Sequence, residues 1–124
     1  MLVFEKITKE VHAGMILFTP VKRKPFKIKS VESEKLVFFV GAKTLIPIPK
    51  AIWNDIPNFL RDQGSVRIGA KYDVAPKRTL QEYIDQHPSR GTQHSSDANY
   101  VTSVLEYLNI VDVKHSQPSE VKLK

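Results

Sequence analysis

A run of cationic side chains between Thr19 and Lys29 is the part of this sequence whose chemistry is plainest. Ammonium and guanidinium groups form charge-assisted hydrogen bonds with phosphate oxygens, so a cluster of them attracts polyanions. Lys43 adds a further cation along the chain. The cluster predicts a nucleic-acid interface in which six residues hold the phosphate backbone, namely Lys22, Arg23, Lys24, Lys27, Lys29 and Lys43.

The net charge of the chain comes entirely from its N-terminal part. The first fifty residues hold ten lysines and arginines against four glutamates, whereas the charges of residues 51–124 sum to zero. Segregated positive charge attracts polyanions without specifying a fold, so we expect DNA as the partner, with RNA as the alternative. The ordinary interpretation is a solvated hairpin whose lysines only keep the protein soluble.

A second set of polar residues lies in the neutral C-terminal half. Amide, hydroxyl and carboxylate groups read base edges in the grooves of DNA. A helix that begins near Ser96 and buries its apolar stripe would expose such groups on its other face. The candidates for base contacts are Arg90, His94, Asn99, Thr102 and Ser103, with Gln93, Ser95 and Glu106 beside them. The alternative is an amphipathic helix with an ordinary polar face.

The histidines show no pattern typical of a metal site or of acid–base catalysis. None of the four has a partner at the i, i+4 spacing on one helix, and His94 with Asp97 lacks a third ligand. Glycine loops that cradle phosphate are also absent from the sequence. We therefore expect neither a metal nor a cofactor.

A small carboxylate cluster is the nearest approach to a nuclease site. Glu32, Glu34 and Lys35 are the residue types that hold and assist Mg²⁺ in such enzymes. Their spacing is more typical of a hairpin turn. We therefore expect a protein without catalytic activity, and a small metal-dependent nuclease remains as an alternative.

Short apolar runs separated by turn residues predict an antiparallel β-meander between residues 14 and 48. Strands are expected near 15–21, 25–31, 35–40 and 43–48. The third is apolar on both faces and predicts a central strand, whereas the prolines at 47 and 49 place the fourth at an edge.

Alternation within the second strand assigns its side chains to two faces. Phe26 and Ile28 are expected in the core, and Lys27 and Lys29 on the opposite face. The strand therefore presents two cations side by side, next to the three of the preceding turn.

A central helix is predicted over residues 50–63, because four apolar residues recur there on one face, and Gly64 is expected to end it. Pro57 predicts a kink or two short helices. Trp53 is expected between this helix and the sheet. Alternation from Val66 to Tyr72 then predicts a half-buried strand.

Two further helices are predicted by their capping residues. Thr79 and Glu82 match a capping box, which predicts a helix to about residue 87. A second helix begins near Asp97, and Asn109 is suited to the left-handed conformation that ends it. Residues 110–113 predict a short strand, and the chain from His115 onward is expected to be frayed.

The helix, loop, helix and strand over residues 79–114 resemble half of a winged-helix module. Together the elements predict an α+β fold: an N-terminal antiparallel β-meander with a packed central helix, followed by the winged-helix-like part. We divide it into residues 1–75, residues 76–115 and a flexible tail, 116–124, within one compact unit.

The composition limits the cellular compartments in which the protein is expected. The chain has no cysteines, so disulfides are excluded and a reducing intracellular environment is expected, either cytoplasmic or nucleoid or nuclear. No apolar run approaches the length of a membrane span, and charges interrupt the N-terminal apolar residues before they could form a signal peptide.

The favoured function is therefore non-catalytic DNA binding. A protein-interaction or oligomerisation module, forming a homodimer or a larger assembly, is the main alternative. In that case apolar residues such as Val37, Phe39 or Tyr107 would form the partner surface.

Overall fold

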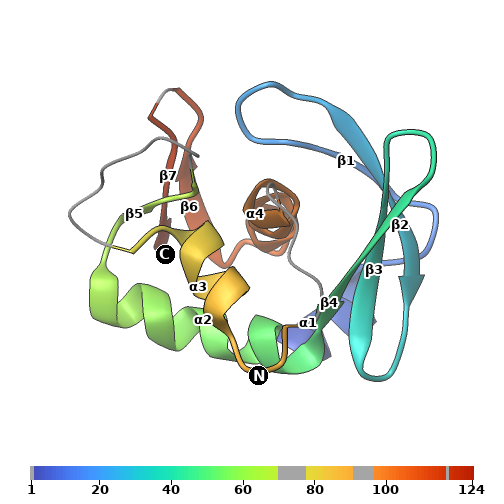
Figure 1. Cartoon of the computed structure of the whole chain (residues 1–124), viewed down its shortest axis with the longest axis horizontal. Helices are drawn as coiled ribbons and strands as arrows, with labels where there is room; N and C mark the ends of the chain where they lie inside the picture. The colour runs from blue at the N-terminus through green and yellow to red at the C-terminus, as the bar shows by residue number, and fades with distance from the viewer. Residues whose placement is uncertain (1, 70–77, 91–96, 117) are drawn as a thin grey trace.

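Helix α4 lies between two antiparallel sheets, with the other helices along one side (Figure 1). The computed structural model describes residues 2–69, 78–90, 97–116 and 118–124, which form a mixed α+β fold. The elements in these residues are α1 (Val3–Glu10), β1 (Ile16–Phe18), β2 (Pro25–Val31), β3 (Lys35–Val40), β4 (Thr44–Pro49), α2 (Lys50–Gln63), β5 (Val66–Arg67), α3 (Leu80–Gln86), α4 (Asp97–Tyr107), β6 (Val111–Lys114) and β7 (Glu120–Leu123).

The four-stranded sheet is the predicted meander, with strand order β1-β2-β3-β4. Strand β3 is central and β4 is at an edge, as the apolar run and the two prolines predict. The Glu32 amide donates to the Lys35 carbonyl at 2.9 Å, which closes the β2–β3 hairpin. Strand β1 ends at Phe18, three residues earlier than predicted.

The core extends from the inner face of this sheet through α2 and α4 to the three-stranded sheet. Phe26 and Ile28 of β2 are buried, as predicted, together with Phe38 of β3. Trp53 of α2 is fully buried, its ring centroid lies 6.3 Å from that of Phe38, and its Nε1 donates to the Ile48 carbonyl at 3.2 Å. The predicted place of Trp53 between helix and sheet is confirmed.

Helix α2 runs without interruption through Pro57, so the alternative of two short helices is wrong. Proline removes one helical hydrogen bond and costs about 3 kcal/mol in a helix interior. Ile56 before it and Phe59 and Leu60 after it are all buried on the same side, and this shared burial keeps the two halves of the helix together. Gly64 ends the helix with φ 78°, as predicted.

Helix α1 is not among the elements that the sequence analysis predicts. Its buried residues Val3, Phe4 and Ile7 lie on one face and pack towards α2. The Phe4 amide donates to Asn54 Oδ1 of α2 at 2.9 Å, which satisfies one of the free donors of the first turn. The apolar spacing of this short segment is the signal that could have found it.

Both C-terminal helices begin and end near the predicted residues. The Thr79 hydroxyl accepts from the Glu82 amide at 3.1 Å, which confirms Thr79 as the N-cap of α3, the first half of the predicted capping box. Asn109 has φ 64° and follows the last turn of α4, as predicted. The predicted buried stripe of α4 is also confirmed, since Val101, Val104, Leu105 and Leu108 are each 1% exposed or less.

The expectation of a frayed tail is wrong for residues 120–123. They form β7, which pairs with both β5 and β6 and is the central strand of the three-stranded sheet. Val121 is fully buried while Lys122 is exposed, so even this short segment has the period of a strand. Strand β5 covers only Val66–Arg67, and residues 70–72 of the longer predicted strand lie outside the described residues.

A pair of substitutions in β7 tests whether the C-terminus is structural. Val121→Ala should lower the free energy of unfolding by about 2 kcal/mol, because it removes two buried methyl groups. Lys122→Ala, on the exposed face, should change it by less than about 0.5 kcal/mol. Urea unfolding measures both values. Equal, negligible effects would show that the segment is frayed in solution.

Candidate nucleic-acid interface

Two cationic turns lie at the same end of the four-stranded sheet. In an antiparallel meander the β1–β2 and β3–β4 connections share one end, and the β2–β3 connection lies at the other. The 19–24 turn, in blue, and the 41–43 turn, in green, both lie at the top of Figure 1. Lys22, Arg23, Lys24 and Lys43 are all exposed there, whereas Glu32 and Glu34 occupy the opposite end. The sheet is therefore polarised along its strands.

The turn over residues 19–24 is held by its own hydrogen bonds. The Thr19 amide donates to the Lys24 carbonyl at 2.9 Å, and the Lys24 amide donates to Thr19 Oγ1 at 3.0 Å. Thr19 is only 8% exposed. This clamp explains why β1 ends at Phe18 instead of continuing to residue 21.

Arg23 has an uncommon backbone conformation within this turn. Its φ is 55°, which costs a residue other than glycine about 1 kcal/mol or more. The Arg23 amide donates to the Thr19 carbonyl at 3.2 Å, and the guanidinium lies 5.7 Å from the centroid of the Phe18 ring. These contacts hold the cation in place before any partner arrives.

Lys27 and Lys29 are exposed on β2, as the alternation predicts. The regular pattern extends only to Ile28, because the register with β3 shifts between Ile28 and Ser30. Lys29 is the extra residue of this β-bulge. Lys27 therefore lies on the regular sheet surface, whereas Lys29 lies at a bend in the strand.

The six cations are free of carboxylate partners within the part of the chain that the structure describes. Elsewhere lysines do pair, for example Lys35 with Glu32 at 3.9 Å. An unpaired exposed cation loses no existing ion pair when it binds an anion. These six residues therefore form a surface, here called the basic surface, that is available to phosphate.

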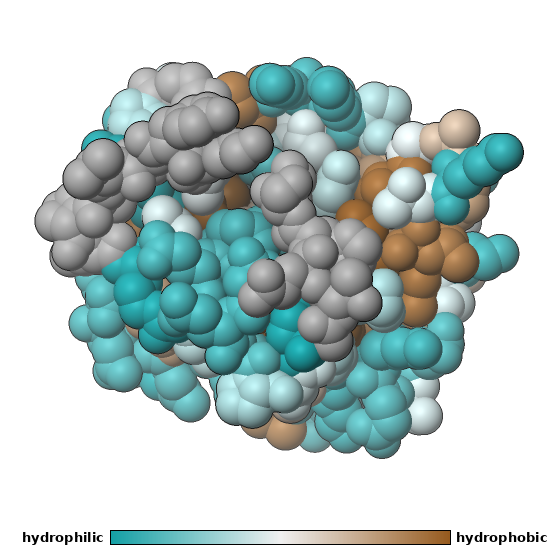
Figure 2. All heavy atoms as spheres, in the orientation of Figure 1, coloured by the Kyte–Doolittle hydropathy of each residue, from teal (hydrophilic) through white to brown (hydrophobic). Residues whose placement is uncertain are grey.

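An apolar row crosses the outer face of the same sheet. The register pairs Ile16 with Lys27, Lys27 with Phe39, and Phe39 with Leu45, so these four residues lie side by side on β1, β2, β3 and β4. Ile16 is 56% exposed and Leu45 is 48% exposed, while Phe39 is half-buried. In Figure 2, apolar (brown) and hydrophilic (teal) atoms lie next to one another over the part of the molecule that this sheet occupies.

Two of the residues expected to contact bases are buried instead. Thr102 is fully buried and Ser103 is 5% exposed, so the expectation of an exposed polar face on α4 is wrong at both. At Ser103 the reason is contact with β1, since Ser103 Oγ donates to the Phe18 carbonyl at 2.7 Å. Asn99 is half-buried, and His94 lies outside the described residues.

Arg90 is held inside the protein. Its side chain is 3% exposed and forms an ion pair with the fully buried Asp97, at the start of α4. Its Nη1 also donates to the Pro47 carbonyl of β4 at 3.2 Å. Burial lowers the pKa of Arg90, and the nearby Asp85 carboxylate raises it. Arg90 therefore joins α4 to the four-stranded sheet and is not exposed to a ligand.

The tyrosines of the C-terminal half differ in exposure. Tyr100 packs against Phe26 and Phe38, with ring centroids 4.9 and 5.9 Å away. Tyr83 stacks on Phe59, with ring centroids 4.3 Å apart. The pKa of Tyr83 is raised, mainly by burial and to a smaller extent by the charge of Asp55, while the charge of Arg78 opposes the shift. Tyr107 is 48% exposed.

His115 connects the 19–24 turn to the C-terminal half of the chain. Its Nδ1 lies 2.6 Å from the Pro20 carbonyl oxygen, and its Nε2 lies 2.6 Å from Glu106 Oε2 of α4. Both partners are acceptors, so the imidazole satisfies both only when each ring nitrogen carries a proton. The bonds to Pro20 and then to Glu106 raise the pKa of His115, whereas burial and the charge of Arg23 lower it.

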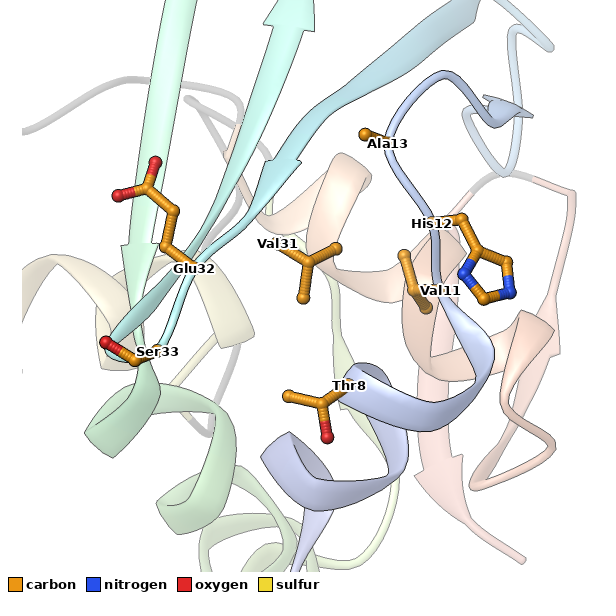
Figure 3. A pocket seen from close by; sticks show the side chains of 7 residues that line it. All are labelled: Thr8, Val11, His12, Ala13, Val31, Glu32 and Ser33. Atoms are coloured by element: carbon orange, nitrogen blue, oxygen red, sulfur yellow. The ribbon is translucent and has the colours of Figure 1, made fainter.

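A hollow of about 420 Å³ lies between the end of α1 and the β2–β3 hairpin. Glu32 and His12, its titratable residues, lie on opposite sides of it (Figure 3). Glu32 is engaged locally, since Ser30 Oγ donates to its Oε2 at 2.8 Å. The carboxylates near residues 32–34 thus belong to a hairpin, as their spacing predicts.

No protein-family model, curated protein or solved structure matches the chain. Among the described residues there is no group of three or more histidine, cysteine, aspartate or glutamate side chains that could hold a metal ion. Within the same residues, none of the helices combines the length and the apolar character needed to cross a membrane.

The His115 contacts predict a pH dependence of stability. Since the folded-state pKa is raised above the ordinary 6.5, this contribution is complete below pH 6.5 and is lost as the pH rises through the folded-state value. His115→Gln should remove this decline, and Glu106→Gln should reduce it. Thermal unfolding from acid to alkaline pH checks the result. The same decline in the His115→Gln variant would assign it to another group.

The buried pair of Arg90 and Asp97 predicts a large stability effect. Asp97→Asn should cost about 3–5 kcal/mol, because it leaves the Arg90 charge buried without its counter-ion. Asp62→Asn, on the exposed side of α2, is the matched control and should cost less than about 0.5 kcal/mol. Urea unfolding compares the two. Similar costs would mean that the pair does not persist in solution.

Proposed function

We propose that this protein binds nucleic acid without catalysing a reaction, with DNA as the first candidate, through the phosphates of the backbone. The observation that carries the proposal is the basic surface: six exposed cations from two turns and one strand, without carboxylate partners among the described residues. Such a partner implies an intracellular location, in the cytoplasm or beside the chromosome.

Preorganisation of the 19–24 turn supports this proposal. Long cationic side chains lose conformational entropy when they bind, so a loop that is already ordered binds at a lower cost. Hydrogen bonds between Thr19 and Lys24 order the backbone, and Phe18 supports the guanidinium of Arg23.

The proposal assigns binding to the basic surface and not to α4. A recognition helix must present its side chains to a groove. The resemblance of residues 79–114 to a winged-helix module would make α4 that helix, but Thr102 and Ser103 are buried, and Ser103 is bonded to Phe18 of β1. Arg90, the cation expected to contact bases, is paired with Asp97.

A salt-dependent titration of duplex DNA, single-stranded DNA and RNA tests the proposal. Each phosphate contact contributes about −0.9 to the slope of log K against log salt on duplex DNA. Lys24→Glu combined with Lys27→Glu should weaken binding about tenfold or more at low salt and make the slope less steep by about two.

Lys9→Glu combined with Lys122→Glu is the matched control. Both lysines are exposed but lie on α1 and β7, and the net charge changes by the same amount. This variant should bind almost as the unaltered protein does. Equal losses in the two variants would reduce the interaction to net charge alone. Failure to bind any of the three nucleic acids, together with self-association by light scattering, would favour the interaction module.

A further inference from the structure

We infer that the target is an unpaired strand, whose bases lie on the apolar row while its phosphates contact the basic surface. This inference rests on the proposed function and names the form of nucleic acid that the same face would bind. It is based on the row Ile16, Lys27, Phe39 and Leu45, which crosses all four strands of the sheet.

The dimensions of the row suit unpaired bases. Neighbouring strands lie about 4.8 Å apart, so four side chains in register span about 14 Å, enough for two or three bases laid on a sheet. Phe39 lies in the interior of the row and is half-buried, which keeps its ring in place while leaving part of it accessible. An aromatic ring stacks on any base, whatever the sequence.

A second aromatic ring lies at the margin, next to the cationic turn. Phe18 is 47% exposed on β1, and Arg23 lies 5.7 Å from its ring centroid. A guanidinium beside an aromatic ring combines phosphate binding with a stacking surface. An unpaired strand that passes from the 19–24 turn onto the sheet would first contact Phe18 and Arg23. It would then contact Lys27 and Phe39.

A duplex cannot use this face in the same way. Its bases are accessible only through the grooves, and the major groove is about 12 Å wide. A four-stranded sheet is broader than that, so Lys27 and Phe39 on the two central strands would not reach the base edges of a duplex. The exposed apolar side chains would then contribute nothing to binding.

The charges also argue against a second copy of the chain as the occupant. A symmetric contact through this face would bring two basic surfaces together and bury Lys27 between Ile16 and Phe39 without a counter-ion. Pairing of strands at the β4 edge is blocked by Pro47 and Pro49, which cannot donate hydrogen bonds. A polyanion with unpaired bases complements both the cations and the apolar row.

The test compares labelled oligothymidine and oligouridine of about 12 nucleotides with a duplex of equal length, by fluorescence anisotropy. We expect the single strands to bind more tightly. Phe39→Ala should weaken their binding about fivefold or more, because it removes a stacking contact. It should leave the salt slope unchanged, because stacking does not depend on salt. Binding of the duplex should not change.

Two further variants make the test specific to stacking. Phe39→Tyr keeps the ring and should retain the affinity, which separates stacking from a defect in folding. Tyr107→Ala removes an exposed aromatic residue from α4 and should have no effect. Thermal unfolding of each variant checks that the sheet is intact. The two oligonucleotides, which differ in the sugar and in the thymine methyl group, show whether DNA or RNA is preferred.

Each contrary result has a distinct meaning. Equal or tighter duplex binding with no effect of Phe39→Ala would overturn this inference and leave the proposed function standing. Absence of binding to all three probes would overturn both. A dimer that dissociates when Leu45 is changed to Glu would assign the row to a second copy and overturn the inference as well.

Discussion

The burial of α4 between two sheets is the constraint on which most of this structure depends. Tyr100 packs against Phe26 and Phe38 of the four-stranded sheet, and α4 also contacts β6 of the other sheet. Burying a polar group of such a helix costs free energy unless the group is hydrogen-bonded or paired, and Thr102 Oγ1 is buried without a hydrogen-bond partner among the described residues. Ser103 donates to the Phe18 carbonyl, and Asp97 forms an ion pair with Arg90. The same burial joins the two halves of the chain and removes α4 from contact with solvent along most of its length.

The 19–24 turn depends on the burial of α4, although the two are far apart in sequence. The carbonyl of Phe18, which precedes the turn, accepts a hydrogen bond from Ser103. The carbonyl of Pro20, within the turn, lies within hydrogen-bond distance of His115 Nδ1. Glu106 of α4 is the other partner of His115. His115 thus bridges the turn and α4 when both of its ring nitrogens carry a proton. Thr19 supplies the local part of this support, and the C-terminal half supplies the rest.

The outer face of the four-stranded sheet combines two properties that usually exclude one another. Exposed apolar side chains favour burial against a partner, while the lysines beside them disfavour burial unless the partner is anionic. Lys27 stands between Ile16 and Phe39 in one cross-strand row, so the two properties cannot be assigned to separate patches. The positive charge that the sequence concentrates in its N-terminal part is therefore found on the same face of the sheet as the exposed apolar side chains.

The sequence alone determined the features that arise from neighbouring residues: the four meander strands, the caps at Thr79 and Asn109, and the exposure of Lys27 opposite buried Phe26. Alternation, capping and turn chemistry act over a few residues, so they can be read locally. Only the tertiary structure decided that Thr102 and Ser103 are buried, that residues 120–123 form a central strand, and that Ile16 aligns with Leu45 across the sheet. These depend on strand register and on which face another element covers. Both are set by contacts between residues distant in the chain, which no local pattern contains.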